Sequence, residues 1–274
     1  MRTPVSSPYL SSRRVGEAVV SLLATGVVGP VPLLKVLGVS EAEGRHAMPE
    51  TTAAGTIVLG KHAVHIQIGT ASLLIDPSAT DPRQAPGVSV GLLTLGLQPE
   101  QITHVLLTHA HGDHFTDVTL EHGGQRVVRY TQARHVLGRL DWDDNPDRQQ
   151  PDSLLNVHLG TVARQGLLDV VAGDQEIVPG VTMRATPGET PGHMIVHVHS
   201  AGQHFYFLGD LFHHACQVEH LDWRFPHQAA IPAARRRLLR AAVREDALLV
   251  FAHHHFPGWG RIVPTDAGYR WEDI

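Results

Sequence analysis

Short apolar runs, separated by turns that contain glycine or proline, recur from residue 55 to the end of the chain. This pattern is typical of strands. One run, residues 102–108, is almost continuously apolar, as expected for a strand covered on both faces. The strands that we expect cover residues 56–59, 62–68, 72–75, 102–108, 125–130, 181–185, 195–199, 204–208 and 248–251.

The N-terminal part of the chain has a weaker pattern. Residues 15–28 mix β-branched side chains with a spacing that a helix also allows, and residues 31–50 indicate an irregular, partly helical segment. The arginine run 235–237 is interpreted as a solvated helix face. Helical segments are expected within residues 84–97, 131–140, 154–165 and 233–244.

Many short strands with a few helices between them predict stacked sheets with helices outside, which is an α/β sandwich. The sequence has no repeat of solenoid period and no low-complexity linker. The simplest organisation is therefore a single structural domain.

The composition argues against several classes of protein. Apolar residues make up 42% of the 274 residues and the net charge is −5, which argues against nucleic-acid binding through a broad basic face. Cys216 is the one cysteine, so a disulfide framework is excluded. The chain lacks the roughly 18 consecutive apolar residues of a membrane span. The twin arginine Arg13–Arg14 precedes an interrupted apolar run without a clean cleavage site, so we expect a cytoplasmic protein that does not enter a membrane.

Histidine is unusually frequent, with 21 residues, and it clusters after the apolar run 102–108. There His109, His111, Asp113 and His114 form an H-x-H-x-D-H motif. A turn at a strand end lets His109 and His111 face one metal ion, while Asp113 and His114 reach a second. The alternative is a polar surface loop rich in histidine. Imidazole is the commonest protein ligand for metals, and we favour a metal site.

Two ions need more ligands than one loop offers, and other predicted strand ends supply them. His193 follows the strand expected at 181–185, Asp210 follows 204–208, and three histidines at 253–255 follow 248–251. Each signal alone is weak, because an aspartate after a strand is more often a helix cap. Together they repeat one arrangement, in which a buried strand delivers a ligand at its end.

The ordered set of Asp76, the H-x-H-x-D-H motif, His193, Asp210 and His253 resembles the metallo-β-lactamase superfamily from about residue 55 to the C-terminus. Residues 252–262 and 268–271 are similar to its methyl parathion hydrolase branch. The resemblance implies a four-layer αββα sandwich. It also implies an N-terminal extension, residues 1–54, with a strand at 19–23 that joins the main fold, and a catalytic domain over residues 55–274.

The resemblance also implies a ligand set. One ion would be held by His109, His111 and His193, and the second by Asp113, His114 and His253, with Asp210 bridging both. Two zinc ions are expected, and iron, manganese or cobalt would also fit. His254 or His255 could replace His253 by a one-residue shift. Asp76 would brace the H-x-H-x-D-H loop by hydrogen bonds.

The implied activity is hydrolysis of an ester, a lactone or a phosphotriester by a metal-bridging hydroxide, with Asp113 orienting the nucleophile or moving its proton. Two positions depart from the family pattern. Glu189 replaces a histidine that is not a ligand, and His213 replaces the tyrosine of acyl-homoserine lactonases. His213 either donates a hydrogen bond to the substrate or faces solvent.

Alternatives of function remain. The chain could be an acyl-homoserine lactonase, a di-iron redox protein, although that class has Glu at the position of His111, or a non-catalytic metal-binding protein. The expected partner is a small-molecule substrate, and a homodimer is left open. Five aromatic residues either line the pocket mouth or pack in the interior: Trp142, Phe212, Trp223, Phe225 and Trp259.

Overall fold

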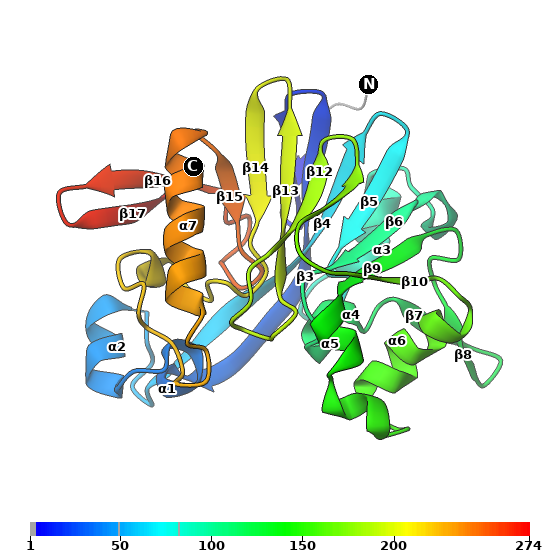
Figure 1. Ribbon diagram of the computed structural model, residues 1–274, viewed down its shortest axis with the longest axis horizontal. Coiled ribbons are helices and arrows are strands. Elements are labelled where there is room, and N and C mark those ends of the chain that lie inside the picture. Colours follow the sequence, from blue (N-terminus) through cyan, green and yellow to red (C-terminus); the bar gives the residue numbers. More distant parts are fainter. Residues whose placement is uncertain (1–3, 49, 82) are drawn as a thin grey trace.

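Two β-sheets pack face to face, and helices cover their outer sides (Figure 1). The computed structural model describes residues 4–48, 50–81 and 83–274. The first sheet has the strand order β1-β2-β3-β4-β5-β6-β9-β10. Its strands are β1 (Ser6–Ser7), β2 (Leu10–Val15), β3 (Ala18–Pro32), β4 (Thr56–Ile68), β5 (Ala71–Ile75), β6 (His104–Leu107), β9 (Arg134–Gly138) and β10 (Leu168–Val171).

The second sheet runs in sequence order from β11 to β17. Its strands are β11 (Gln175–Val178), β12 (Val181–Ala185), β13 (Met194–Ser200), β14 (Gln203–Phe207), β15 (Leu248–Val250), β16 (Gly260–Thr265) and β17 (Gly268–Asp273). A separate hairpin pairs β7 (Thr119–His122) with β8 (Gln125–Val128). The α-helices are α1 (Leu33–Leu37), α2 (Glu41–Ala47), α3 (Gly87–Thr94), α4 (Gly112–Phe115), α5 (Arg139–Asp143), α6 (Leu154–Arg164) and α7 (Ile231–Arg244). Short 3₁₀ turns span Pro99–Gln101, Pro146–Gln149 and Ala215–Val218.

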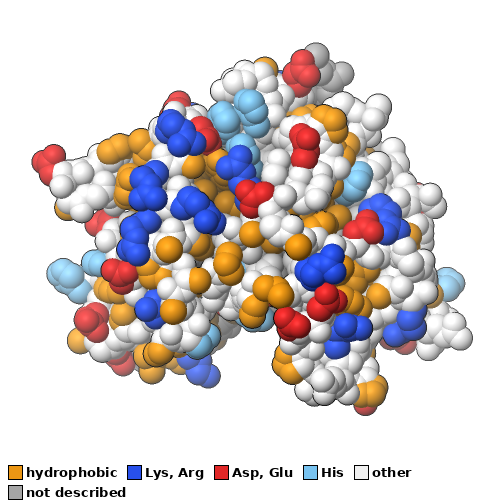
Figure 2. All heavy atoms as spheres, in the orientation of Figure 1, with side chains coloured by type: hydrophobic (Ala, Val, Ile, Leu, Met, Phe, Trp, Pro, Cys, Tyr) orange, Lys and Arg blue, Asp and Glu red, His pale blue; other side chains and the backbone are white. Residues whose placement is uncertain are grey.

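Alternation along the strands builds the layers. On β13, Val196 and Val198 point into the core between the two sheets, while Ile195 packs on the outer side with Leu238 and Leu239 of α7. Another apolar cluster joins the outer face of the first sheet to α3 and α6. These three layers of contact confirm the four-layer αββα fold. Figure 2 shows Lys and Arg side chains gathered over α7, as expected for its solvent-facing side.

The N-terminal strands belong to the first sheet, because β3 pairs with β4 along most of its length. The strand that the resemblance placed at residues 19–23 lies within β3, and α1 and α2 fall in the segment expected to be partly helical. The boundary between residues 1–54 and 55–274 stays a prediction. Among the described helices, none is long and apolar enough to cross a membrane.

Several local predictions were wrong. Residues 131–140 are not a helix, because residues 134–138 form β9, whose pairing between β6 and β10 overrides local helical spacing. Residues 56–59 and 62–68 form one continuous strand, β4, because β3 pairs across Gly60 and Lys61. The hairpin β16–β17 was not anticipated. The helices expected at 154–165 and 233–244 are confirmed as α6 and α7.

The arginine run 235–237 is only partly a solvated face. Arg235 is 1% exposed, and its guanidinium donates hydrogen bonds to the carbonyl oxygens of Leu211, Leu221 and Trp223. Burial lowers the pKa of Arg235 to about 9. Its place one turn before Leu239 on the inner side of α7 explains the error, because a run of like charges says nothing about which member faces inward.

Candidate metal centre

Loops that follow β6, β12, β14 and β15 meet at one edge of the sandwich, where backbone hydrogen bonds hold them together. The amide of Met194 donates to the carbonyl of Thr108 at 2.8 Å, and the amide of Ala252 donates to the carbonyl of Gly209 at 3.1 Å. These bonds join the β6 loop to the start of β13, and the β14 loop to the β15 loop. Side chains projecting from the four loops therefore share one small volume.

Two groups of potential ligands contain the residues of the H-x-H-x-D-H motif. His109, His111 and Asp210 form one group, and Asp113, His114 and His253 form the other. Within each group, one ligand atom from every residue lies within 4.8 Å of the others. These six residues are all among those singled out from the sequence. Their convergence from three separate loops is far more specific than the motif alone.

Asp210 lies between the two groups. Its Oδ2 atom is 3.7 Å from Nε2 of His109 and 3.3 Å from Nε2 of His253, while Oδ1 is 3.4 Å from Nε2 of His114. Asp113 adds a second carboxylate, 3.6 Å from Nε2 of His253. Oδ2 thus lies between the two groups and Oδ1 faces the second, so this carboxylate is placed where a ligand shared by two ions would lie.

His193 lies beside the first group rather than within it. Its ring centroid is 5.2 Å from that of His109, and its Nε2 accepts a hydrogen bond from the backbone amide of Asp210 at 3.2 Å. The lone pair of Nε2 therefore already faces the loop that carries Asp210. An ion bound to this nitrogen would take the place of the amide hydrogen bond.

The outer nitrogens of the histidines are held by fixed acceptors. Nδ1 of His253 donates to the carbonyl of Gly60 at 2.9 Å, and Nδ1 of His114 donates to Asp76 at 2.8 Å. The hydroxyl oxygen of Thr108 lies 3.0 Å from Nδ1 of His109. A proton on Nδ1 leaves the Nε2 lone pair directed to the centre, as in histidines that bind metals.

Asp76 organises the H-x-H-x-D-H loop. Oδ1 accepts the amide of Thr108 at 2.8 Å, and Oδ2 accepts both the hydroxyl of Thr108 at 2.7 Å and Nδ1 of His114. The residue is fully buried at the end of β5. These contacts agree with the bracing role expected for Asp76.

Sequence reasoning missed Asp141, which connects two ligand loops. This buried carboxylate in α5 accepts hydrogen bonds from the amide of Ala110 at 2.9 Å, the amide of Gly192 at 2.6 Å and the hydroxyl of Thr190 at 2.7 Å. Burial raises the pKa of Asp141, while these donors act in the opposite direction. The sequence signal that could have found Asp141 is a carboxylate three residues after β9. Residues 131–140 were expected to form a helix, so no strand end was recognised there.

Burial and mutual charge set the electrostatics of the centre. Burial, and then the neighbouring His114, hold the pKa of His109 well below its ordinary range, and burial lowers that of His193 to about 3. Burial acts in the same direction on His114, but Asp210 and Asp76 outweigh it and raise its pKa. Asp210 has a pKa well below its ordinary range, because His253 and His114 outweigh burial. Asp210 outweighs burial at His253 too and raises its pKa. The buried carboxylate therefore favours positive charge beside the second group, a charge that a divalent cation would supply in place of protons.

The residues present fit a metal pair. Nε2 of His114 and Oδ1 of Asp210 are buried and have no hydrogen-bond partner within the described ranges. Buried polar atoms are nearly always paired, so two unpaired atoms that face each other indicate a missing shared partner. Nitrogen and carboxylate ligands of this kind suit zinc and similar divalent ions.

His213 and Glu189 border the centre. Nε2 of His213 is 3.4 Å from Oδ2 of Asp210, and its ring stacks on that of His253 with 5.7 Å between centroids. His213 therefore points toward the centre rather than away from it. Glu189, with a side chain 9% exposed, has Oε1 3.6 Å from His111 and Oε2 bonded to the amide of Gln228.

The structure distinguishes the three histidines at 253–255 and places two of the aromatic candidates. His254 is buried and contacts Asp273 at 3.0 Å, while His255 is exposed, so His253 is the member of the triplet that faces the centre. Phe212 and Trp259 are each 1% exposed and pack in apolar clusters, which excludes them from the pocket mouth.

Comparisons with known proteins agree with this architecture. The family model of the metallo-beta-lactamase superfamily matches residues 57–253. The chain therefore belongs to the metallo-β-lactamase superfamily. Its relation to the methyl parathion hydrolase branch stays a prediction.

Sequence relatives match only in part. A metal-dependent hydrolase of Rhizobium leguminosarum bv. trifolii is 39% identical over 59 residues, which cover 22% of this chain and 23% of that protein. An N-acyl homoserine lactonase of Bacillus thuringiensis is 26% identical over 103 residues, covering 37% of this chain and 35% of that protein. The matches thus span about a quarter to a third of these relatives.

Solved structures match over nearly the whole chain. The hydrolase AbOPH of the beta lactamase superfamily superposes with a TM-score of 0.82 at 18% identity, covering 98% of this chain and 99% of that one. AidC, a dizinc quorum-quenching lactonase in complex with its product, gives a TM-score of 0.76 at 18% identity, with 97% of each chain covered. At such identities the likeness shows the fold.

Proposed function

We propose that this protein is a hydrolase with two zinc ions that cleaves an ester, a lactone or a phosphotriester. The observation that carries the proposal is the position of Asp210, whose two oxygens lie 3.3–3.7 Å from ring nitrogens of His109, His114 and His253. A carboxylate shared in this way suits a bridge between two ions. The ions of such a pair lie about 3.5–4 Å apart.

The assignment of ligands follows the two groups. His109, His111 and His193 would hold one ion, and Asp113, His114 and His253 would hold the other, with Asp210 between them. Ions bound there would supply Lewis acidity, which activates water and polarises a carbonyl or phosphoryl oxygen.

The chain's own residues would bind and orient the substrate and move protons. Asp113 has a side chain 37% exposed and faces both the centre and solvent, so it can hold the proton of an attacking water and pass it outward. His213, directed at Asp210, can donate a hydrogen bond to the electrophilic oxygen. The His111 side chain is 48% exposed, so the site is open to substrate, which disfavours a sealed, non-catalytic metal-binding protein.

The test combines elemental analysis with a substrate panel. Purified protein is stripped with a chelator and refilled with zinc, and p-nitrophenyl esters, acyl-homoserine lactones and paraoxon-like triesters are compared. We expect about two zinc ions for this site and hydrolysis that returns on refilling. Equal hydrolysis by stripped and refilled protein would refute the proposal, and bound iron without hydrolysis would support a di-iron redox protein instead.

Matched histidine variants sharpen this test. His111→Gln removes a proposed ligand, whereas His122→Gln changes an exposed histidine at the end of β7 that belongs to none of the ligand groups among the described residues. We expect the first to lower zinc affinity and kcat/KM by at least about 100-fold, more than the loss of an outer partner costs. The second should stay within a few-fold of the unsubstituted protein.

An acyl-homoserine lactonase is the second candidate, favoured by the relative from Bacillus thuringiensis. Here His213, near Asp210, would take the place of the substrate-binding tyrosine. His213→Phe should then lower kcat on lactones about 10- to 100-fold with zinc content unchanged. An unchanged kcat would remove His213 from the mechanism. A cytoplasmic location and a homodimer stay predictions.

A further inference from the structure

A second cluster of metal-capable side chains lies on the outer face of the β13–β14 hairpin. His197 and His199 are two residues apart on β13 and share a face, and the strand register pairs His199 with His204 and His197 with Tyr206. Glu245 follows the last residue of α7 and reaches the same face. Figure 2 shows histidine side chains beside acidic and basic ones near the upper ends of β13 and β14.

We propose that His197, His204 and Glu245 form a separate binding site for a single divalent ion of the zinc class. One ligand atom from each of the three lies within 4.8 Å of the others. His197 lies four residues after His193, which directly precedes β13, so their Cα atoms are roughly 13 Å apart. The two sites therefore share no ligand.

The distances fit one shared ion. Nε2 of His197 is 3.0 Å from Nδ1 of His204, and that atom is 3.5 Å from Oε2 of Glu245. Two ligand atoms in a tetrahedral zinc site, each about 2.0–2.1 Å from the ion, are about 3.3 Å apart. The observed separations bracket this value, so small rotations of the side chains would complete the site.

The side chains are held in place by their surroundings. The ring of His197 stacks on Tyr206 with 4.2 Å between centroids, and the ring of His204 stacks on His199 at 4.4 Å. The hydroxyl of Tyr206 donates to Oε2 of Glu245 at 2.6 Å. A site whose ligands are already oriented loses little conformational freedom on binding.

The protonation states suit a cation. Burial lowers the pKa of His197 to about 3 and also lowers that of His204, so both rings are neutral at neutral pH. Burial acts against ionisation of Glu245, but hydrogen bonds from Tyr206 and Arg244 outweigh it and keep its pKa below the ordinary value. Binding would replace the hydrogen bond between the rings, and its proton would move to the other nitrogen of the same ring, so neither ring gains charge.

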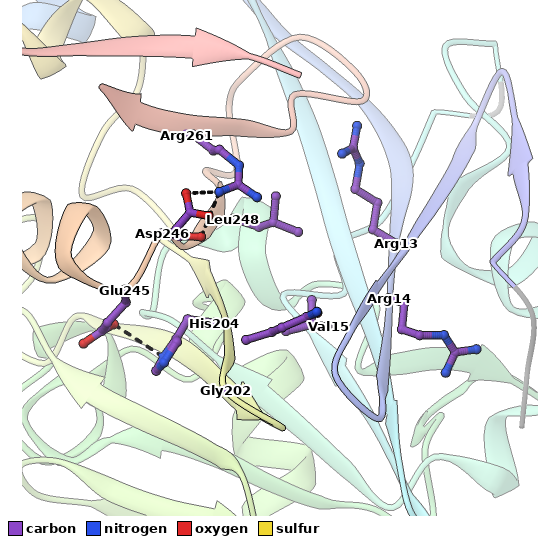
Figure 3. A pocket seen from close by; sticks show the side chains of 10 residues that line it. Arg13, Arg14, Val15, Gly202, His204, Glu245, Asp246, Leu248 and Arg261 are labelled. Atoms are coloured by element: carbon purple, nitrogen blue, oxygen red, sulfur yellow. Dashed lines mark hydrogen bonds and ion pairs between the residues drawn. The ribbon is translucent and has the colours of Figure 1, made fainter. Parts of the chain in front are cut away.

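An ion can reach this site from solvent. The side chains of His204 and Glu245 are 17% and 14% exposed. They border a cavity of about 490 Å³ that is also lined by Arg13, Arg14 and Arg261. Figure 3 shows His204 and Glu245 pointing toward each other at one side of the cavity. Water in this cavity would fill the remaining coordination position. The bound ion would join the hairpin to the end of α7.

The decisive measurement is zinc stoichiometry in the full-length protein, determined by elemental analysis after equilibration against a weak chelator. His204→Gln should hold one ion fewer than the unsubstituted protein and keep its hydrolytic rate. His199→Gln is the matched control, because this exposed ring stacks on His204 but does not belong to the cluster. It should hold as many ions as the unsubstituted protein.

Thermal unfolding gives a readout apart from activity. Added zinc should raise the Tm of the centre-stripped protein further in the unsubstituted chain and His199→Gln than in His204→Gln. Glu245→Gln, which keeps an acceptor for Tyr206, should behave like His204→Gln and decides the matter if His204→Gln does not fold. Equal stoichiometry in all folded variants would overturn the proposal. Absence of hydrolysis in the unsubstituted, zinc-loaded protein would instead contradict the proposed function. The comparison of zinc stoichiometry between the variants would still test the second site.

Discussion

Gly60 holds the loop that carries His253, and replacing it should disturb fold and site together. The amide of Gly60 donates to the carbonyl of His253 at 3.1 Å, and Nδ1 of His253 donates to the carbonyl of Gly60 at 2.9 Å. A Cβ atom at Gly60 would overlap the carbonyl oxygen of His254, which also accepts a hydrogen bond from Nε2 of His62 at 2.6 Å. Gly60→Ala therefore cannot be accommodated by moving a flexible side chain.

The size of the effect follows from these contacts. A carbon and a carbonyl oxygen approach to about 3.3 Å, so the His254 carbonyl must move by at least about 1 Å. That exceeds the roughly 0.2 Å tolerance of a metal–ligand distance. The two hydrogen bonds between Gly60 and His253, worth about 1 kcal/mol each, are weakened, and overpacking adds about 1–3 kcal/mol to the loss of stability. We expect the free energy of unfolding to fall by about 3–5 kcal/mol.

Urea unfolding and zinc titration test this expectation. Val58→Ala, on the same strand and 53% exposed, is the control and should change stability by less than about 0.5 kcal/mol. In Gly60→Ala we expect at least one bound ion to be lost or weakened about 10- to 100-fold, as when an outer partner of a ligand is removed. Stability and zinc content equal to those of Val58→Ala would refute the reasoning.

Three further predictions, the last with a matched control substitution, concern buried charged residues. Asp141→Asn places an amide where an oxygen accepts backbone N–H groups, and should lower the free energy of unfolding in urea by about 2–3 kcal/mol; unchanged stability would contradict its role. Burial raises the pKa of Asp117 to about 6, above the unfolded value of about 3.9, so its stabilising contribution is present at low pH and lost as the pH rises through 6. Asp117→Asn should remove about 3 kcal/mol of this pH dependence, and equal slopes in both proteins would refute it. Arg235→Lys should cost about 2–4 kcal/mol and Arg236→Lys, on the exposed side of α7, less than about 0.5 kcal/mol; equal losses would contradict the burial of Arg235.

The candidate ligands could be selected from the sequence because they follow strands. His109, Asp210 and His253 each come directly after a buried apolar run, and such runs are recognisable without knowing their neighbours. Strands ending at one edge of a sandwich bring those residues together. The prediction failed where pairing decides the structure, as at residues 134–138, whose sequence also fits a helix.

The contacts that hold the ligand loops together could not be predicted, because they join distant segments through their backbones. Gly60 meets the loop of His253, and a Cβ atom at Gly138 would overlap the carbonyl of Gly192, next to His193. At each of these two contacts the residue nearest the other backbone is a glycine. The local sequence pattern gives no reason to expect a glycine at either position. The cluster of His197 and His204 has the same origin, because only strand register and the end of α7 bring its members together. The positions of the candidate ligands can thus be recognised from the local sequence. The exact placement of their side chains depends instead on close backbone contacts between loops.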